Sequence, residues 1–280
     1  MSKIRVEGLK YRYPDMDSLV LDDLSFEVEK GAFIGIVGEN TAGKSTLCYA
    51  LTGLVPHFFK GAYGGNVLID NIDVKQSEIS DVTSKAGLVF DQPFSQMTGS
   101  KTTVYEEIAF GLENSGVERE EMRIRIDNSL RLMDIEHLQN KNPYDLSGGQ
   151  MQRVAIASVL AMKPDVIVLD EPTSQLDPQG SDEVFQVIAK LAESGITIIM
   201  AEHKLEKLAE YASKILLLHK GKQIAYGSPK EVFSRDDILE YGIAPPVYVR
   251  IAKALKLKNK AGFYPITLDG LKQQWNVGDE

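Results

Sequence analysis

The most constraining feature of the sequence is a glycine-framed loop between an apolar stretch and a helical stretch. Residues 33–37 are apolar, and residues 38–46 then read GENTAGKST. This segment matches the pattern G-x-x-x-x-G-K-S/T, in which backbone N–H groups surround phosphate oxygens and the lysine, here Lys44, supplies a positive charge. Residues 44–51 have the pattern of a helix. The order of strand, loop and helix predicts a phosphate site made by Gly38, Glu39, Asn40, Thr41, Ala42, Gly43, Lys44, Ser45 and Thr46.

Composition and charge exclude several classes of protein. The chain of 280 residues has a formal net charge of −9, which disfavours a general nucleic-acid binder because contacts to phosphate backbones need a basic surface. Cys48 is the single cysteine, so no disulfide can form within the chain. No apolar run approaches the roughly 20 residues needed to cross a bilayer, and the N-terminus has no basic-then-apolar signal segment. We therefore expect a cytosolic protein whose contact with any membrane is peripheral.

Short apolar runs separated by helical stretches predict a buried parallel sheet. Four such runs follow the phosphate loop, at residues 87–90, 166–169, 196–200 and 215–218. The first thirty residues instead alternate between apolar and polar side chains, which is typical of antiparallel strands with one solvated face. The expected fold class is α/β, with an antiparallel β subdomain beside a mostly parallel core sheet.

Two parts of the chain fall outside this alternation of strands and helices. Apolar residues recur at helical spacing over residues 122–133, which predicts a helical subdomain inserted between the second and third strands of the core sheet. After Gly227 the alternation weakens. We expect the main domain to span residues 1–235 and a small C-terminal extension to span residues 236–280. We interpret the lysines of this extension as a solvated face: Lys253, Lys256, Lys258 and Lys260.

Two adjacent carboxylates follow the third predicted strand of the core sheet. Asp170 and Glu171 come directly after the apolar residues 166–169, at the edge where α/β sheets bind ligands. One carboxylate can hold Mg²⁺, and the next can position or deprotonate a water that attacks a γ-phosphate. A solvated acidic turn is the alternative. The glycine loop in the same chain favours a site for Mg²⁺ and a nucleoside triphosphate.

A third motif carries the resemblance to a known family. Residues 146–150 read LSGGQ, and Ser147 is placed to cap a helix whose positive end a ligand can approach past two glycines. A plain capped helix start is the alternative. The same five residues are the signature sequence of ATP-binding-cassette (ABC) ATPases. With the phosphate loop and the paired carboxylates, the chain resembles this group of P-loop NTPases along nearly all of residues 1–235.

The resemblance implies a role for each motif residue in binding and hydrolysing ATP. It implies that Lys44 contacts the β- and γ-phosphates and that Ser45 and Asp170 bind Mg²⁺. It also implies that Glu171 is the general base and that His203 is the switch histidine that contacts the γ-phosphate. A lone histidine would more often be structural, but His203 follows the other motifs in the family's order.

ABC ATPases pair head to tail, so the resemblance implies that each ATP is held between two subunits. The partner's contribution to each site corresponds to Ser147, Gly148, Gly149 and Gln150. Tyr13 matches the aromatic residue that stacks on adenine, although a strand tyrosine can also serve packing alone. Asp177 matches the D-loop, which lines the contact between subunits, and it can also cap the helix that follows.

The phosphate loop departs from the family's usual residues at two positions. Many relatives have glycine where this chain has Thr41 and serine where it has Ala42. A β-branched residue fits poorly at positive φ. We therefore predict that Gly38 and Gly43 provide the sharp turns and that Thr41 donates its N–H to phosphate from ordinary dihedral angles.

The segment called the Q-loop departs from the family pattern as well. It usually reads V-F-Q, whereas residues 89–93 read VFDQP. Either Asp91 takes the glutamine's place near Mg²⁺ and the attacking water, or Gln92 does so after a shift of one residue. Such a shift would reverse the side-chain direction in an extended segment. We favour Asp91, because an oxygen ligand is all that the metal requires.

The residues after the Q-loop resemble those of one class of transporter ATPase, the energy-coupling factor (ECF) type. The similarity covers residues 91–96 and 103–111, and it extends to residues 56–61 and to the C-terminal extension, which often helps such subunits to pair. It implies an ATPase that powers a vitamin or metal importer from the cytoplasmic face of the membrane. The implied partners are a second ATPase subunit, identical or related, a transmembrane scaffold protein and a substrate-binding membrane protein.

Several alternatives stay open at this point. The chain could serve another class of ABC transporter, or be a soluble ABC switch that acts on nucleic acid or ribosomes. Such switches usually carry two cassettes or large coiled-coil insertions, so one cassette with an acidic balance leads us to expect no nucleic-acid partner. A non-hydrolysing regulatory subunit is disfavoured by the presence of Glu171 and His203.

Two groups of apolar residues also keep two interpretations each. Residues 56–61 either carry the ECF resemblance or form a surface loop with two buried phenylalanines. Phe94, Met97 and Tyr105 belong either to the core or to a groove that receives a partner helix.

Overall fold

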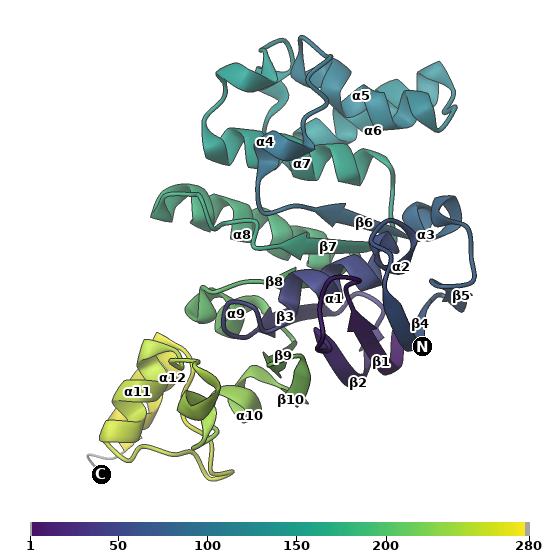
Figure 1. Ribbon diagram of the computed structural model, residues 1–280. Coiled ribbons are helices and arrows are strands. Elements are labelled where there is room, and N and C mark those ends of the chain that lie inside the picture. Colours follow the sequence, from purple (N-terminus) through teal and green to yellow (C-terminus); the bar gives the residue numbers. More distant parts are fainter. Residues whose placement is uncertain (1, 278–280) are drawn as a thin grey trace.

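The computed structural model describes residues 2–277, and a four-stranded antiparallel sheet forms one part of it (Figure 1). The strand order is β2-β1-β4-β5, and each neighbouring pair is antiparallel. Side chains alternate between buried and exposed along β2, as expected for a sheet with one solvated face. The predicted antiparallel subdomain is confirmed. Its strands are β1 (Ser2–Arg12), β2 (Leu21–Glu29), β4 (Ala62–Ile69) and β5 (Ile72–Asp73).

A six-stranded sheet with the order β10-β9-β3-β8-β7-β6 lies at the centre of the fold. All pairings are parallel except that of β10 with β9, so the predicted mostly parallel core sheet is confirmed. Strands β3, β7 and β8 are buried along their whole length, which explains their continuous apolar sequences. The strands are β3 (Phe33–Val37), β6 (Ala86–Val89), β7 (Val166–Asp170), β8 (Thr197–Ala201), β9 (Lys214–His219) and β10 (Lys222–Gly227).

Two hydrophobic clusters lie on opposite faces of the core sheet. Successive side chains of a strand point to opposite faces, so Val166 and Val168 enter one cluster while Ile167 and Leu169 enter the other. The first cluster contains α1 (Lys44–Leu51) and the antiparallel sheet, and the second contains α8 (Pro178–Glu193) and α9 (Leu205–Tyr211). Packing on both faces holds the ends of the core strands, where the phosphate loop begins, in fixed positions.

A helical subdomain is inserted between β6 and β7, as predicted, and it forms the top of the molecule in Figure 1. Helix α7 packs against both α5 and α6 and also contacts β6. Within residues 122–133, Ile126, Leu130 and Met133 are buried, and Met122 packs at the edge of the same cluster. The elements are α4 (Pro93–Gln96), α5 (Val104–Asn114), α6 (Arg119–Leu132), α7 (Gly148–Ala161) and the 3₁₀ helices η1 (Glu136–Leu138) and η2 (Pro143–Asp145).

Shorter helices complete the main part of the chain. Helix α1 occupies residues 44–51, as predicted, directly after the phosphate loop. The other short helices are α2 (Leu54–His57), α3 (Ile79–Lys85) and α10 (Pro229–Phe233). Over residues 2–277, no helix combines the length and the apolar character that a membrane crossing requires.

The C-terminal segment after α10 contains η3 (Ile238–Tyr241), α11 (Val247–Ala254) and α12 (Leu268–Val277). Its buried residues, such as Ile238 and Val249, belong to the same cluster as α8 and α9, so it packs directly on the rest of the chain. The interpretation of its lysines as a solvated face is confirmed, since Lys253, Lys256, Lys258 and Lys260 are all exposed. Lys253 Nζ lies 3.1 Å from Asp236 Oδ1, and Lys258 Nζ lies 4.7 Å from the centre of the Tyr264 ring.

Candidate nucleotide-binding site

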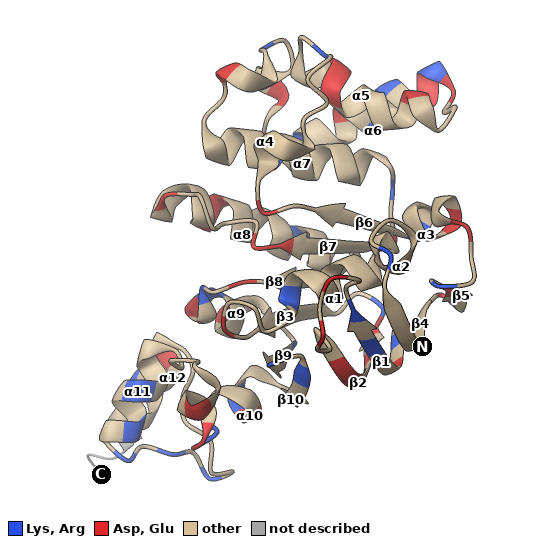
Figure 2. Cartoon of the chain, viewed as in Figure 1, with Lys and Arg blue, Asp and Glu red and all other residues tan. Residues whose placement is uncertain are grey.

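The carboxyl ends of three core strands place the candidate catalytic groups at one edge of the sheet. The phosphate loop follows β3, Glu171 follows β7, and His203 comes two residues after β8. Because β8 pairs in parallel with both β3 and β7, these three ends lie next to one another. In Figure 2, acidic residues mark the point where β7 ends.

Two glycines of the phosphate loop stand where a larger residue would not fit. Gly43 has φ 101°, and a Cβ at this position would lie 2.8 Å from the Val20 carbonyl oxygen. A Cβ at Gly38 would lie 2.6 Å from the Leu218 carbonyl oxygen. The outer glycines of the motif are therefore required by the close approach of neighbouring backbone, as the sequence pattern predicts.

The conformation of Thr41 contradicts our prediction of ordinary dihedral angles. Thr41 has φ 68°, which lies in the left-handed region. A loop that turns successive N–H groups toward one anion needs a left-handed residue among right-handed ones. For a residue with a Cβ, that conformation costs about 1–2 kcal/mol. The chain therefore keeps the turn and accepts backbone strain at Thr41.

Lys44 lies at the centre of a small group of buried and half-buried side chains. Its Nζ donates hydrogen bonds to the carbonyl oxygens of Gly38, at 3.1 Å, and Glu39, at 3.2 Å. The same Nζ lies 3.3 Å from Glu171 Oε1 and 3.3 Å from His203 Nε2. The structure thus brings together Lys44, Glu171 and His203, the three residues predicted to act in catalysis.

Glu171 is held by contacts on both its backbone and its side chain. His203 Nε2 lies 2.9 Å from Glu171 Oε1, and a carboxylate only accepts, so the histidine N–H donates. This hydrogen bond lowers the pKa of Glu171, and the positive charge of Lys44 lowers it further. Burial acts in the opposite direction and raises this pKa. Glu171 has φ 48°, an unusual conformation of the kind that occurs at functional sites. An ionised Glu171 fits the chemistry of a general base.

Asp170 has the properties of a metal ligand. Its side chain is 3% exposed, and its Oδ1 atom has no hydrogen-bond partner among the described residues. The pKa of Asp170 is raised to about 6, mainly by burial. The negative charges of Glu171 and Asp91 also raise it, and the hydrogen bond with the Ser45 hydroxyl acts in the opposite direction. A buried oxygen without a partner beside a serine hydroxyl suits Mg²⁺, which takes one or two protein oxygens and fills its shell with water and phosphate oxygens.

Within residues 2–277, no three His, Cys, Asp or Glu side chains gather into a group that could hold a metal ion by themselves. Mg²⁺ bound at Ser45 and Asp170 would therefore take most of its ligands from water and phosphate. The two Q-loop candidates, Asp91 and Gln92, are both exposed. Asp91 lies close enough to Asp170 for its charge to raise the pKa of that residue.

A cleft of about 820 Å³ runs along the phosphate loop from Tyr13 to Glu171. Its volume falls within the range of small-molecule and cofactor sites. The Tyr13 hydroxyl lies 3.2 Å from Thr46 Oγ1, and the Tyr13 ring packs edge-on against Tyr11, with 4.8 Å between the ring centres. Tyr13 therefore packs within its own sheet and also lines the cleft.

The sequence did not predict the other walls of this cleft. The connection between β1 and β2 contributes Met16, Leu19 and Val20, and the turn between β9 and β10 contributes Lys220 and Gly221. Met16 and Leu19 are large apolar residues with about half of their surface exposed. Two apolar residues in a polar loop were the available signal for these walls, since exposed apolar residues often line binding sites.

The signature residues lie in a second cleft, which has a volume of about 470 Å³. Ser147 caps α7 as predicted, since its Oγ accepts from the Gln150 N–H at 3.4 Å and Gln150 Oε1 accepts from the Ser147 N–H at 3.2 Å. Asp177 also lines this cleft, and it caps α8 by accepting from the Gly180 N–H at 2.7 Å. The two clefts share no lining residue, so a single chain does not bring its signature motif to its own phosphate loop.

Comparison with known proteins decides the family. Residues 21–174 match the ABC transporter family. The chain belongs to this family. Its members hydrolyse ATP to drive transport, and this ABC ATPase is an enzyme of that kind.

Named relatives cover most of the chain. An ABC transporter ATP-binding protein of Pyrococcus abyssi, itself named as putative, is 44% identical over 258 residues, which span 91% of each chain. The energy-coupling factor transporter ATP-binding protein EcfA1 of Bacillus licheniformis is 40% identical over 257 residues, which span 90% of this chain and 88% of the relative.

Solved structures of ABC ATPases show the same fold. The structure of cbiO1 from Clostridium perfringens superposes with a TM-score of 0.76 and 34% identity, over 91% of this chain and 99% of the other. A dimeric ATP-binding cassette in a post-hydrolysis state with ADP and phosphate superposes with a TM-score of 0.70 and 27% identity, over 81% of this chain and 98% of the other.

The strain at Thr41 leads to a prediction about stability. Thr41→Gly relieves the backbone strain of the left-handed conformation, but it also raises the conformational entropy of the unfolded chain. We therefore expect the free energy of unfolding to rise by up to about 1 kcal/mol. Gly43→Ala is expected to lose at least about 2 kcal/mol, because it adds both strain and a clash with Val20. Urea unfolding measures both changes. Ala42→Gly is the control in the same loop, with an expected loss of about 0.5–1 kcal/mol. A loss for Thr41→Gly as large as that of the control would contradict the strain at Thr41.

The raised pKa of Asp170 predicts how stability depends on pH. The folded-state pKa of about 6 exceeds the ordinary value of 3.8, so stability contributed by this group is present below pH 4 and is lost as the pH rises through 6. Asp170→Asn removes that loss. Without nucleotide, the stability of the variant relative to the wild type should rise between pH 4 and pH 8 by up to about 3 kcal/mol. Denaturant midpoints across this range measure the effect, and a difference that stays flat or falls with pH would show that Asp170 is not buried as a charged group.

Proposed function

We propose that this ABC ATPase is the motor subunit of an ECF-type importer for a vitamin or a transition metal. The observation that carries the proposal is the 40% identity to EcfA1 of Bacillus licheniformis along almost the whole chain. The structure of cbiO1, which is described as part of the ABC transporter complex cbiONQ, is similar over 91% of this chain. We propose the same kind of assembly here, with the ATPase held at the cytoplasmic face of the membrane by its partners.

We propose that ATP binds between two ATPase subunits, either identical or related. Each chain carries a phosphate cleft at one place and a signature cleft at another, and neither cleft contains the complete set of motifs. A head-to-tail pair would place residues 147–150 of one subunit against the phosphate loop of the other. The similar cassette that was solved as a dimer supports this arrangement.

Within such a pair, Lys44 and the loop N–H groups would hold the β- and γ-phosphates. Mg²⁺ would be held by Ser45 and Asp170, and when bound it offsets the negative charge that develops on the phosphates. Glu171 would accept a proton from the attacking water, and His203 would orient Glu171 and contact the γ-phosphate. Loss of the γ-phosphate removes contacts that hold the pair closed, so hydrolysis would open it.

We propose roles for the remaining motif residues as well. Asp91 would face the metal and the attacking water, a proposal supported by its effect on the pKa of Asp170. Tyr13 would stack on adenine, and Asp177 would line the contact between subunits. The partner's signature residues, which correspond to Ser147 and Gly149, would donate to the γ-phosphate at the positive end of α7.

A groove of about 580 Å³ between α3 and β6 on one side and α5 and α7 on the other is our proposed docking site for the scaffold protein. Gln96 spans this groove, since its Oε1 accepts from the Phe90 N–H at 3.2 Å and its Nε2 donates to the Ala155 carbonyl at 3.5 Å. Phe90 belongs to the Q-loop, and Ala155 belongs to α7, the helix that begins at the signature residues. A helix seated here would contact Gln96, which is hydrogen-bonded both to the Q-loop and to α7.

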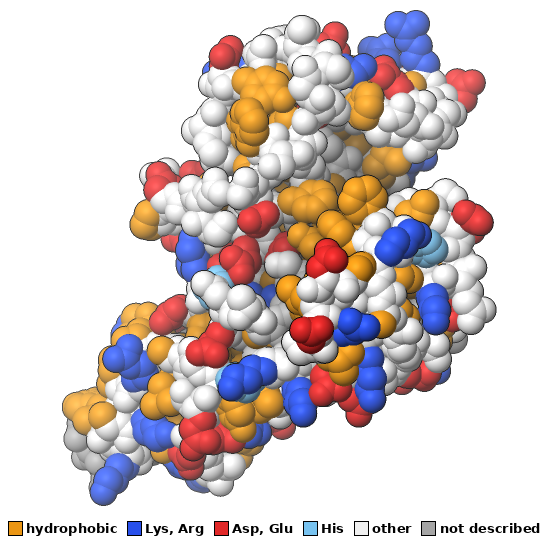
Figure 3. All heavy atoms as spheres, viewed as in Figure 1, with side chains coloured by type: hydrophobic (Ala, Val, Ile, Leu, Met, Phe, Trp, Pro, Cys, Tyr) orange, Lys and Arg blue, Asp and Glu red, His pale blue; other side chains and the backbone are white. Residues whose placement is uncertain are grey.

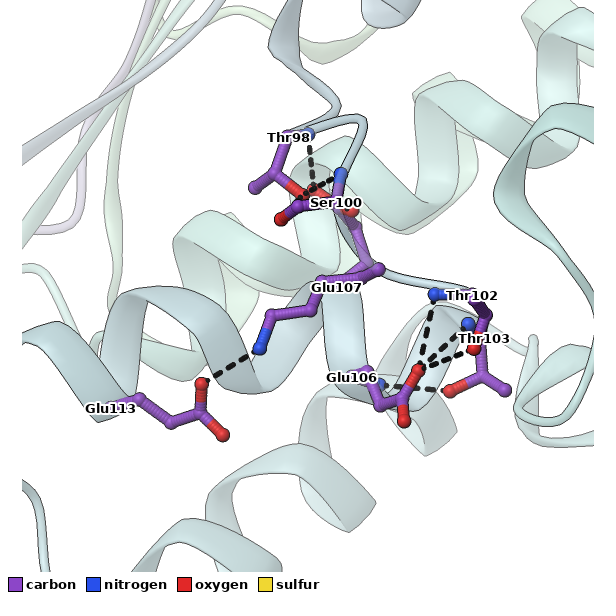
Figure 4. Close-up of polar contacts among 8 residues, drawn as sticks. Thr98, Ser100, Thr102, Thr103, Glu106, Glu107 and Glu113 are labelled. Atoms are coloured by element: carbon purple, nitrogen blue, oxygen red, sulfur yellow. Dashed lines mark hydrogen bonds and ion pairs between the residues drawn. The ribbon is translucent and has the colours of Figure 1, made fainter.

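The loop that borders the groove is held in one shape by two glutamates (Figure 4). Glu107 is buried and accepts from the Thr98 N–H at 2.8 Å and from the Thr98 hydroxyl at 2.9 Å. Glu106 forms a capping box with Thr103 at the start of α5. Anchoring of this loop gives a docking helix a preformed wall rather than one that must order on binding.

Of the apolar residues for which the sequence allowed two interpretations, some lie in the core and others on the surface. Met97 is buried in the core, Tyr105 packs at its edge, and Phe94 is 64% exposed against Tyr144. In residues 56–61, Phe58 is 72% exposed while Phe59 stacks on Tyr49, so the expected pair of buried phenylalanines is wrong for Phe58. Figure 3 shows hydrophobic side chains gathered where the helical subdomain meets the core, which is a suitable surface for a membrane-protein partner.

We propose that residues 236–280 help the two ATPase subunits to pair, and that residues 1–235 form the catalytic domain. Helix α11 and its C-cap residue expose Val247, Ile251 and Leu255, which are spaced four residues apart and lie on one face. Each has about two fifths of its side-chain surface exposed. An apolar face of this kind is suited to the same face on a second subunit.

The importer proposal predicts which proteins accompany the chain in native membranes. Extraction in mild detergent with a tagged chain should recover a transmembrane scaffold protein, a substrate-binding membrane protein and a second ATPase subunit. Phe110→Glu places a charge in the proposed groove and should reduce recovery of the scaffold protein about tenfold or more, because a buried unpaired charge costs several kcal/mol. ATP binding by the purified variant, measured separately, checks that it is folded.

Ile124→Glu is the matched control, since Ile124 is exposed on the same subdomain but does not line the groove. It should leave recovery of the scaffold protein within twofold of the unmodified chain. Recovery of ribosomes or nucleic acid in place of membrane proteins would overturn the importer proposal. Equal losses for Phe110→Glu and Ile124→Glu would overturn the position of the docking groove.

A further inference from the structure

A buried carboxylate, that of Glu202, stands directly before the proposed switch histidine. Glu202 follows β8 and is 2% exposed. Its Oε1 accepts from the His203 N–H at 2.7 Å and from the Lys204 N–H at 3.3 Å. Its Oε2 accepts from the Thr173 hydroxyl at 2.6 Å. Both oxygens of the carboxylate are therefore occupied by donors from two separate segments.

The partner segment is the one that carries the proposed general base. Thr173 is fully buried and lies two residues after Glu171. The Lys204 ammonium donates to the Thr173 carbonyl at 3.1 Å, so a second hydrogen bond joins the same two segments. The Ser174 N–H donates to the Glu171 carbonyl at 3.1 Å, which closes a tight turn around Thr173. Displacement of Thr173 would therefore move Glu171 as well.

Burial of a carboxylate is costly unless each oxygen is hydrogen-bonded. Among residues 2–277, Glu202 forms no ion pair with Lys, Arg or His, and two backbone N–H groups and one hydroxyl satisfy its oxygens. A strong local bond to the His203 N–H fixes the backbone from which the histidine ring reaches Glu171.

We propose that Glu202 is a positioning residue for ATP hydrolysis, which holds the backbone of His203 and couples it to Thr173. The coupling keeps the His203 ring in register with the Glu171 carboxylate, 2.9 Å away. This inference rests on the role proposed for His203. It adds a second, buried connection between the ends of β7 and β8 to the direct contact between the two side chains.

Loss of the hydrogen bond between Glu202 and Thr173 should affect the rate of ATP hydrolysis and not the binding of ATP. Neither Glu202 nor Thr173 lines the cleft along the phosphate loop. Loss of the connection should therefore lower kcat and leave KM for ATP nearly unchanged. A residue that merely stabilised the fold would change the unfolding midpoint without this separation.

Thr173→Val tests the inference because it removes the hydroxyl and preserves the side-chain shape. We expect kcat to fall about tenfold, with KM within twofold, which corresponds to a coupling energy common for groups in one hydrogen-bond network. Thr173→Ser restores the hydroxyl and should keep kcat within twofold of the wild type. In a His203→Ala background, Thr173→Val should change the residual kcat less than twofold, because the group it positions is absent.

Each other outcome counts against the proposal. Unchanged kcat in Thr173→Val, or the same tenfold loss with and without His203, would show that the connection does not act through the histidine. If Thr173→Val fails to fold, Thr173→Ala replaces it, because it also removes the hydroxyl that donates to Glu202 and leaves no methyl group in its place. Wild-type kcat in a folded Thr173→Ala variant would overturn the inference. Wild-type kcat in His203→Ala would contradict the proposed role of His203. A lowered kcat in His203→Ala together with wild-type kcat in Thr173→Val would contradict only the role of Glu202.

Discussion

The Lys44 ammonium group is the electrostatic centre on which the rest of the site depends. It is 4% exposed, and it is held by two loop carbonyls and by the carboxylate of Glu171. A buried cation in that place requires a fixed loop on one side and a fixed carboxylate on the other. The core sheet provides both, since β3 leads into the loop, β7 leads into Glu171, and β8 lies between the two strands.

The packing beneath the site maintains strained backbone conformations within it. Thr41 and Glu171 both have positive φ, and such conformations persist only where the surrounding structure determines them. Helix α1 and the buried strands of the core sheet provide that support. The signature motif lies in a separate cleft from the phosphate loop, and we propose that a second subunit completes the site. Chemistry at the phosphate can in this way control whether two subunits stay together.

Much of the fold and of the site followed from the sequence. The buried strands, α1, and α7 and α8 with their caps were predictable because local sequence patterns determine them. The grouping of Lys44, Glu171 and His203 was implied by the resemblance to ABC ATPases. Thr41 was predicted wrongly, since its conformation is imposed by the loop against the preference of the residue. The position of Lys220 in the cleft and the hydrogen bond between Thr173 and Glu202 depend on contacts between segments far apart in the chain, which no local pattern encodes.

The central claim is that two subunits enclose ATP between the phosphate loop of one and the signature residues of the other. Sedimentation of Glu171→Gln with Mg²⁺ and ATP tests it most directly, because this variant should retain ATP and hardly hydrolyse it. The account predicts a stable dimer with ATP bound, and it predicts that adding Ser147→Arg returns the protein to a monomer that still binds ATP through its own phosphate loop. A monomer with ATP fully enclosed in Glu171→Gln, or a dimer unaffected by Ser147→Arg, would contradict the claim.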